Sequence, residues 1–193
     1  MIDKIFKDGK KIDLLKLMRS NLKKIAGVLA FLILIVIFFF YKDYQEKKQN
    51  IIISNKYNES VILINKNQSN QAKELLYYII NKKNKFYSPL ALFLLIENKI
   101  INEDSKIIDF FDTVISIKNL DQENKNLIII KKTLYLLANN NNSKIEELLN
   151  PIINSNSEWR KQAITILANF YLSKGEGLKS KEYFDLLKTK FKK

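Results

Sequence analysis

The 193-residue sequence contains no cysteine and no histidine. Without cysteine there is no disulfide framework, no thiolate nucleophile and no lipid-modified cysteine. The usual imidazole and thiolate ligands of zinc, iron and copper sites are missing as well, and so is every catalytic dyad or triad that uses imidazole as its base. We therefore expect no metal, no other cofactor and no enzymatic activity.

Glycine is scarce too, with four residues at Gly9, Gly27, Gly175 and Gly177. Phosphate-binding loops and dinucleotide fingerprints need several glycines within a few positions, so neither motif can be present. Glu146 and Glu147 are adjacent rather than on one helical face, which does not suit a pair of carboxylates acting as acid and base.

Arginine occurs only at Arg19 and Arg160, although the net charge is +13. Lysine, asparagine and isoleucine are all abundant together, which indicates a drift in composition more than a selected basic surface. Nucleic-acid binders typically combine arginine forks with aromatic residues placed among basic ones. We find no such interleaving in the sequence and predict no nucleic-acid partner.

A long apolar run covers residues 25–41, IAGVLAFLILIVIFFFY, which are 17 residues without a charge. Its side chains favour entry into a bilayer by about 5 kcal/mol, and a helix of this length spans about 25 Å. A buried core helix is the alternative, but such helices are rarely apolar on every face. The run ends in Phe38, Phe39 and Phe40 without the small residues of a signal-peptidase site, so we expect a retained transmembrane helix in the lipid bilayer.

The charges on either side of this run predict its orientation. Eight basic residues precede the span and four follow it within a similar distance. The positive-inside rule therefore places residues 1–24 in the cytoplasm and residues 42–193 across the membrane, in the periplasm of a cell with an inner membrane. For residues 1–24 two interpretations stay open, an amphipathic helix on the anionic inner leaflet or a plain basic topology signal.

Beyond the span, helical periodicity dominates and predicts an all-α domain over residues 42–193. Seven polar breaks separate eight helical stretches; they lie at 65–70, 81–85, 101–105, 119–123, 139–143, 154–157 and 174–177. Ser105 precedes one stretch, and Ser143 with Glu146 has the spacing of a capping box. Pro89 lies near the first turn of its helix, where a missing N–H is tolerated.

The helical stretches repeat a spacing typical of tetratricopeptide repeats, which pair two helices in about 34 residues. In the last pair Ala168 and Tyr171 occupy the first helix, Gly175 the turn, and Ser180, Phe184 and Leu187 the second helix. Pairs beginning at Ser60 and Thr133 keep the same steps, through Ala72, Leu76 and Ile79, and through Ile145, Leu149 and Ile152. The pair beginning at Ala91 reaches Ile107, Phe111 and Val114 only with about four extra residues in its turn. We predict four degenerate repeats over residues 44–191, with a non-repeating helical bundle as the alternative.

This architecture of a short basic N-terminus, one span, Tyr41 and Tyr44 just outside it and a helical-repeat domain of about 150 residues resembles the YfgM-like proteins. These are ancillary subunits of the bacterial Sec translocon. The resemblance covers nearly the whole chain and rests on architecture and spacing. It implies association with the SecYEG translocon, with periplasmic chaperones and with exported proteins as they emerge.

In such repeats the first helix of each pair lines a concave surface. The positions expected to face it are Val61, Ile64, Leu92, Leu95, Leu134, Leu137, Asn169 and Leu172. An exposed apolar stripe would bind unfolded or extended chains by burying their side chains, whereas a tightly curved repeat would make the same residues part of the core. Trp159, at the start of a helix, is expected to pack.

The sequence therefore predicts a membrane-anchored scaffold or chaperone adaptor at the Sec translocon. The runner-up is a tethered scaffold for another envelope machine, in cell division or outer-membrane assembly. Both share every sequence feature described so far, and only the identity of the bound proteins distinguishes them.

Overall fold

The computed structural model describes residues 22–188, and within that range every regular element is a helix. The chain divides into two units, Met1–Ile51 and Ile52–Lys193. Most of the segment predicted as an amphipathic helix, residues 1–21, lies outside the described range, as does the end of the predicted repeats at Phe191.

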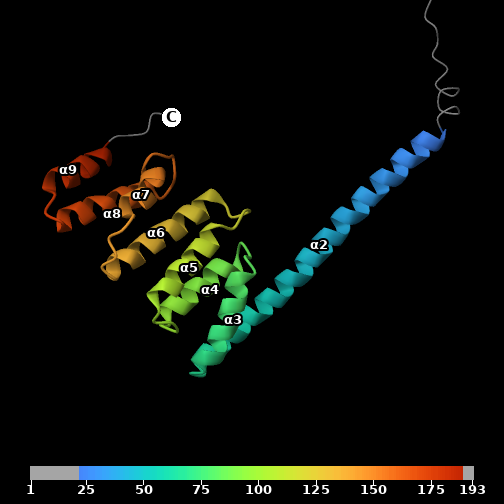
Figure 1. Cartoon of the computed structure of the whole chain (residues 1–193), viewed down its shortest axis with the longest axis horizontal. Helices are drawn as coiled ribbons and strands as arrows, with labels where there is room; N and C mark the ends of the chain where they lie inside the picture. Colours follow the sequence, from blue (N-terminus) through green and yellow to red (C-terminus); the bar gives the residue numbers. More distant parts are fainter. Residues whose placement is uncertain (1–21, 189–193) are drawn as a thin grey trace, which may run out of the picture. The chain divides into compact units, whose positions relative to one another are not determined.

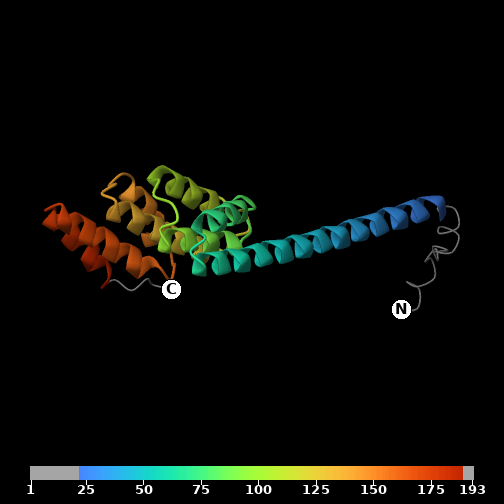
Figure 2. The ribbon, with the colours of Figure 1, turned by 90° about the horizontal axis from the view of Figure 1, so that it is seen from below.

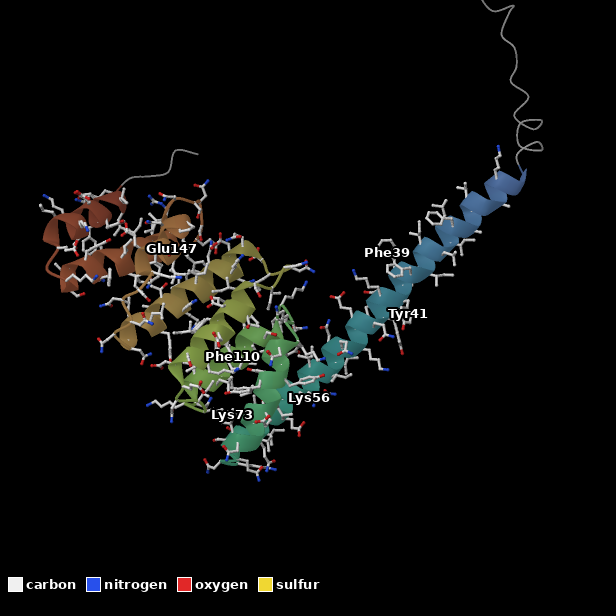
Figure 3. All side chains as sticks on the ribbon, in the orientation of Figure 1. Phe39, Tyr41, Lys56, Lys73, Phe110 and Glu147 are labelled. Atoms are coloured by element: carbon white, nitrogen blue, oxygen red, sulfur yellow. The ribbon has the colours of Figure 1, made fainter. Side chains whose placement is uncertain are left out.

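The first unit contains the N-terminal part of helix α2, Leu22–Asn65, which includes the apolar run. This helix is long and apolar enough to cross a membrane, although a signal sequence near an N-terminus would share both properties. Its large side chains are exposed on every face, and Phe39 and Tyr41 are examples in Figure 3. Exposure of this extent in water is costly, so the helix needs an apolar environment.

The second unit begins where α2 becomes amphipathic. Ile53 and Ser60 are buried, and Tyr57 and Ile64 are partly buried one turn after each of them. Residues 42–51, where the exported domain was predicted to begin, lie in the same helix as the apolar run. Their side chains are mostly exposed because nothing in the described unit packs on them.

Seven further helices complete the second unit. They are α3 (Ser69–Asn81), α4 (Tyr87–Glu97), α5 (Asp104–Ile115), α6 (Gln122–Ala138), α7 (Ile145–Ile153), α8 (Arg160–Ser173) and α9 (Gly177–Leu186). From α3 on, each helix packs on the next, and α3 also contacts α5 while α6 contacts α8. Figures 1 and 2 show α3 to α9 following one another in chain order. The described residues thus confirm the prediction of eight helical stretches separated by seven polar breaks.

Two apolar clusters form the core of this unit. The first includes side chains from α2 to α6, with Phe111 and Ile128 among its buried members. The second is built from α6 to α9, with Ile130 and Leu167 among its members. Helix α6 contributes to both. Trp159 is partly buried against the second cluster, as expected for a packing residue.

The predicted helix starts are only partly correct. Pro89 does lie in the first turn of α4. Ser143, however, caps no helix: α7 begins at Ile145 after Lys144 in a left-handed conformation, and the Ser143 hydroxyl donates to Asn141. Ser105 lies inside α5, where its hydroxyl donates to Glu103. In both places the serine bonds a nearby side chain, so the backbone N–H groups of the helix start gain no side-chain acceptor from it.

Candidate functional site

A hollow of about 300 Å³ lies on the second unit where α4, α5 and α6 meet. We call it the α4/α6 groove. Its walls come from three helices: Phe93, Ile96 and Glu97 from α4, Phe111 from α5, and Lys131, Leu134 and Tyr135 from α6. Five of these seven side chains are apolar or aromatic, so the groove suits an apolar side chain of a ligand.

The sequence of α4 explains why apolar side chains remain at the surface here. This helix, YSPLALFLLIE, has one charged residue, Glu97 at its end, and is apolar on almost every face. Ala91, Leu92 and Leu95 face the core and are fully buried. Phe93 and Ile96 lie at the edge of this buried face, where they pack against the first cluster and are only partly buried. The exposed surface of α4 is therefore apolar, because this helix has no polar face.

Leu134 on α6 is the most exposed apolar member of the groove, with 45% of its surface accessible. Burying a leucine side chain that is half exposed gains on the order of 1 kcal/mol. Leu134 is thus the residue at which a bound partner would gain the most from contact.

The polar groups of the groove lie beside its aromatic rings. The Lys131 ammonium lies 4.5 Å from the centre of the Phe93 ring, within the range of a cation–π contact. The Tyr135 ring lies 6.0 Å from that of Phe111, and its hydroxyl donates to the Asp104 carboxylate. Burial, and secondly this hydrogen bond, raise the pKa of Tyr135 to about 12. Tyr135 therefore stays neutral at physiological pH.

The eight positions predicted to face a concave stripe are divided by the structure. Leu92 and Leu95 are fully buried, so the core alternative applies to them. Val61, Ile64 and Leu137 are partly buried, and Asn169 and Leu172 are exposed. Of the eight, the groove includes Leu134 alone. The described structure therefore has no continuous exposed stripe.

Sequence reasoning missed the other six groove residues as site residues, Phe93, Ile96 and Lys131 among them. On α4 the surface residues lie one position beyond those predicted, 93 and 96 in place of 92 and 95. No periodic signal was available to reveal this shift, because a helix that is apolar on every face has no preferred direction in its pattern.

A second hollow, of about 590 Å³, lies among α7, α8 and α9 and is polar. The Glu146 carboxylate accepts hydrogen bonds from Tyr171 and, at 3.1 Å, from Tyr183. The Tyr171 hydrogen bond lowers the pKa of Glu146, and partial desolvation opposes it. The same hydrogen bond raises the pKa of Tyr171, and burial raises that pKa further. Lys179 lies over the Tyr171 ring at 4.8 Å and pairs with Glu176 at 2.7 Å. The polar and charged groups of this hollow thus pair with one another, and their contacts connect α7, α8 and α9.

Groups of three or more acidic residues that could hold a metal ion are absent from residues 22–188. The chain matches no protein-family model, no curated protein and no solved structure. Its function must therefore be argued from the groove, the apolar helix and the packing of the helices.

Proposed function

We propose that this chain is a membrane-anchored helical scaffold that holds a segment of a partner protein in the α4/α6 groove. The observation that carries the proposal is the exposed Leu134 in a groove walled by Phe93, Ile96 and Phe111. Exposed apolar hollows with a few polar groups at their edge are typical of sites that bind a side chain of another protein. The partner segment inserts one apolar side chain and places its flanking polar groups near Lys131 and Glu97.

The anchor of the scaffold is the apolar part of α2, held in a lipid bilayer through residues 25–41. Its exposed apolar surface supports this assignment. The basic residues before the span support an orientation with the N-terminus in the cytoplasm and the second unit in the periplasm.

The scaffold itself consists of four degenerate tetratricopeptide-like repeats, formed by the pairs α2/α3, α4/α5, α6/α7 and α8/α9. Support comes from the four small residues at the equivalent position of each first helix, Ser60, Ala91, Thr133 and Ala168. All four are fully buried. Small residues at that step allow neighbouring helices to approach closely, which is the packing requirement of this repeat.

The place of action that we propose is the Sec translocon, with periplasmic chaperones and emerging exported proteins as the bound partners. This part rests on the resemblance in architecture to the YfgM-like proteins and on the groove, since emerging chains are extended and expose apolar side chains. A scaffold for another envelope machine, in cell division or outer-membrane assembly, is the alternative.

Site-specific photo-cross-linking in intact cells tests the proposal. A photoreactive amino acid at position 134 should capture a translocon subunit, a chaperone or an exported chain. The matched control is position 62, because Ile62 is also an exposed apolar residue, at 53%, and lies outside the groove. Equal capture from the two positions would contradict a binding role for the groove. Capture of a different envelope complex from position 134 alone would favour the alternative.

A further inference from the structure

The two walls of the α4/α6 groove repeat one pattern of positions. Each wall has a first residue and the residues three and four positions later, which lie on one face of a helix. They are Phe93, Ile96 and Glu97 on α4, and Lys131, Leu134 and Tyr135 on α6. The buried Phe111 reaches the groove from α5, which packs on both α4 and α6. Each wall thus has one charged side chain, at the last position on α4 and at the first on α6.

The positive charge lies at one end of the groove. The Lys131 ammonium lies 4.5 Å from the centre of the Phe93 ring, so the first positions of the two walls are neighbours. This contact restricts the lysine side chain, and less conformational entropy is then lost when it meets an anion. Lys132, the next residue, is buried and pairs with Asp112 at 2.6 Å, so it adds no net charge. Lys131 is therefore the cation that a ligand meets at this end.

The negative charge lies one helical turn further along. Glu97 follows Phe93 by four residues, which is about 6 Å along the helix axis. On the opposite wall Tyr135 follows Lys131 by the same four residues, and its hydroxyl donates to the Asp104 carboxylate. The second end of the groove therefore has one carboxylate in its wall and another bound to its tyrosine.

The other charges around the second end do not reverse its sign. Three carboxylates and two ammonium groups occur from the end of α4 to the first turn of α5, at Glu97, Lys99, Glu103, Asp104 and Lys106. The Lys106 ammonium lies 5.2 Å from the Phe110 ring and 5.9 Å from the Tyr77 ring, on the side of α5 that faces α3. Asp109, on the next turn of α5, is also acidic and exposed. The groove is thus positive at its Phe93 end and negative at its Glu97 end.

We infer that the groove binds an extended polypeptide segment in which an apolar residue lies between an acidic and a basic residue. The acidic side chain meets Lys131, the apolar one contacts Leu134, and the basic one meets Glu97. In an extended chain the two neighbours of a residue are about 6.7 Å apart, which matches the helical turn between the two ends. A lipid has its charges at one end of its tail and a nucleic acid has no cation, so a polypeptide fits the two charges. This inference rests on the proposed function and adds the chemical class of the bound segment.

Capture of short peptide probes by the full chain in lipid nanodiscs tests the inference. Each probe has blocked termini and a photoreactive leucine analogue at its centre, flanked by one aspartate and one lysine, by two aspartates or by two lysines. Mass spectrometry measures the capture on the fragment that contains Leu134. The mixed probe should be captured about fivefold more than either of the others, because each of those replaces one attraction by a repulsion. Salt at about 0.5 M should remove the difference, since the Debye length is then about 4 Å.

Charge reversals separate the role of each end from folding and from net charge. Glu97→Lys should make the probe with two aspartates the best captured, by about fivefold, and Lys131→Glu should do the same for the probe with two lysines. Loss of folding cannot produce such gains. Glu147→Lys on α7 and Lys161→Glu on α8 are the matched controls, because they make the same charge changes at exposed residues outside the groove. Both should keep the preference for the mixed probe.

Three outcomes would overturn the inference. Equal capture of the three probes, with competition by a free Asp-Leu-Lys peptide but not by Asp-Ser-Lys, would leave an apolar site without an order of charges, and the proposed function would stand. A preference that Glu97→Lys changes no more than Glu147→Lys does would assign it to the overall charge of the chain. Capture at Leu134 no greater than at Ile62, for every probe, would reject the groove as a site and the proposed function with it.

Discussion

Glu146 receives hydrogen bonds from tyrosines on two other helices, Tyr171 on α8 and Tyr183 on α9. The sequence had suggested a local role for it, in a capping box with Ser143. A residue whose local spacing suggests a capping box can thus form a tertiary contact instead. Local spacing could not reveal this contact, because the two tyrosines are 25 and 37 positions away in the sequence.

The depressed pKa of Glu146 predicts a dependence of stability on pH. Because the folded pKa lies below the ordinary value of 4.5, the contribution of Glu146 is fully present above that value. It is lost as the pH falls through the folded pKa. We therefore expect wild-type stability to fall between about pH 5 and pH 3 by more than that of Glu146→Gln. Urea unfolding at a series of pH values, monitored by Trp159 fluorescence, measures the slope of stability against pH for both proteins.

Glu147→Gln is the control for this experiment, because Glu147 is the adjacent exposed carboxylate and has no hydrogen bond among those described. The slope of its stability against pH should match that of the wild type. If Glu146→Gln also keeps the wild-type slope, the tyrosine hydrogen bonds do not contribute to stability.

Ala168 is fully buried where α8 packs against its neighbours. Ala168→Leu adds three carbon atoms at a site without room and should lower the free energy of unfolding by roughly 1 to 3 kcal/mol. Ala138→Leu, at the exposed end of α6, is the matched control and should change it little. A denaturation midpoint for Ala168→Leu equal to that of the control would argue against close approach of the helices at this position.

At the scale of single elements, Gly175 ends α8 with a φ of +77°, and the N–H of Glu176 donates to the Tyr171 carbonyl at 3.0 Å. An alanine in this left-handed conformation costs about 1 to 2 kcal/mol. Gly175→Ala should therefore lower the thermal midpoint, measured by the fluorescence of Trp159.

Gly177 provides the comparison, since it is the first residue of α9 and an added methyl group meets nothing within 4 Å. Gly177→Ala should leave the midpoint unchanged or raise it, because alanine restricts the unfolded chain. A similar loss from both substitutions would mean that backbone conformation at Gly175 is not the cause.

The connections between helices were the part of the fold most open to prediction. The seven polar breaks coincide with the seven connections between α2 and α9, because asparagine and other polar residues cluster where no apolar face continues. The small residues at Ser60, Ala91, Thr133 and Ala168 were also identified by spacing, and all are buried.

The surface of α4 was not open to prediction in the same way. Its apolar residues occur on every face, so spacing alone cannot separate Leu92 and Leu95, which are core, from Phe93 and Ile96, which line the groove. The lysines that lie over the Tyr77 and Tyr78 rings were missed for a different reason. They come from three helices, and only packing brings them to the same rings.

For the whole molecule, the charge asymmetry around residues 25–41 predicts that the C-terminal unit lies outside the cytoplasm. Protease added to spheroplasts should digest the chain beyond about Lys42. Only the span, which lies in the bilayer, and the N-terminus, which lies in the cytoplasm, are out of its reach. A cytoplasmic marker protein should survive as the control for intact cells. An undigested C-terminal unit in such cells would reverse the orientation.

The division of the core into two clusters has a consequence for how the molecule opens. Because α6 supplies Ile128 to one cluster and Ile130 to the other, the two halves share a helix but few other side chains. Stability in stacked helices is close to a sum of neighbouring contacts, so opening one half leaves the other largely intact. Amide hydrogens of α8 and α9 should then exchange with solvent water at rates that differ as a group from those of α3 and α4, with α6 protected as long as either half stays closed.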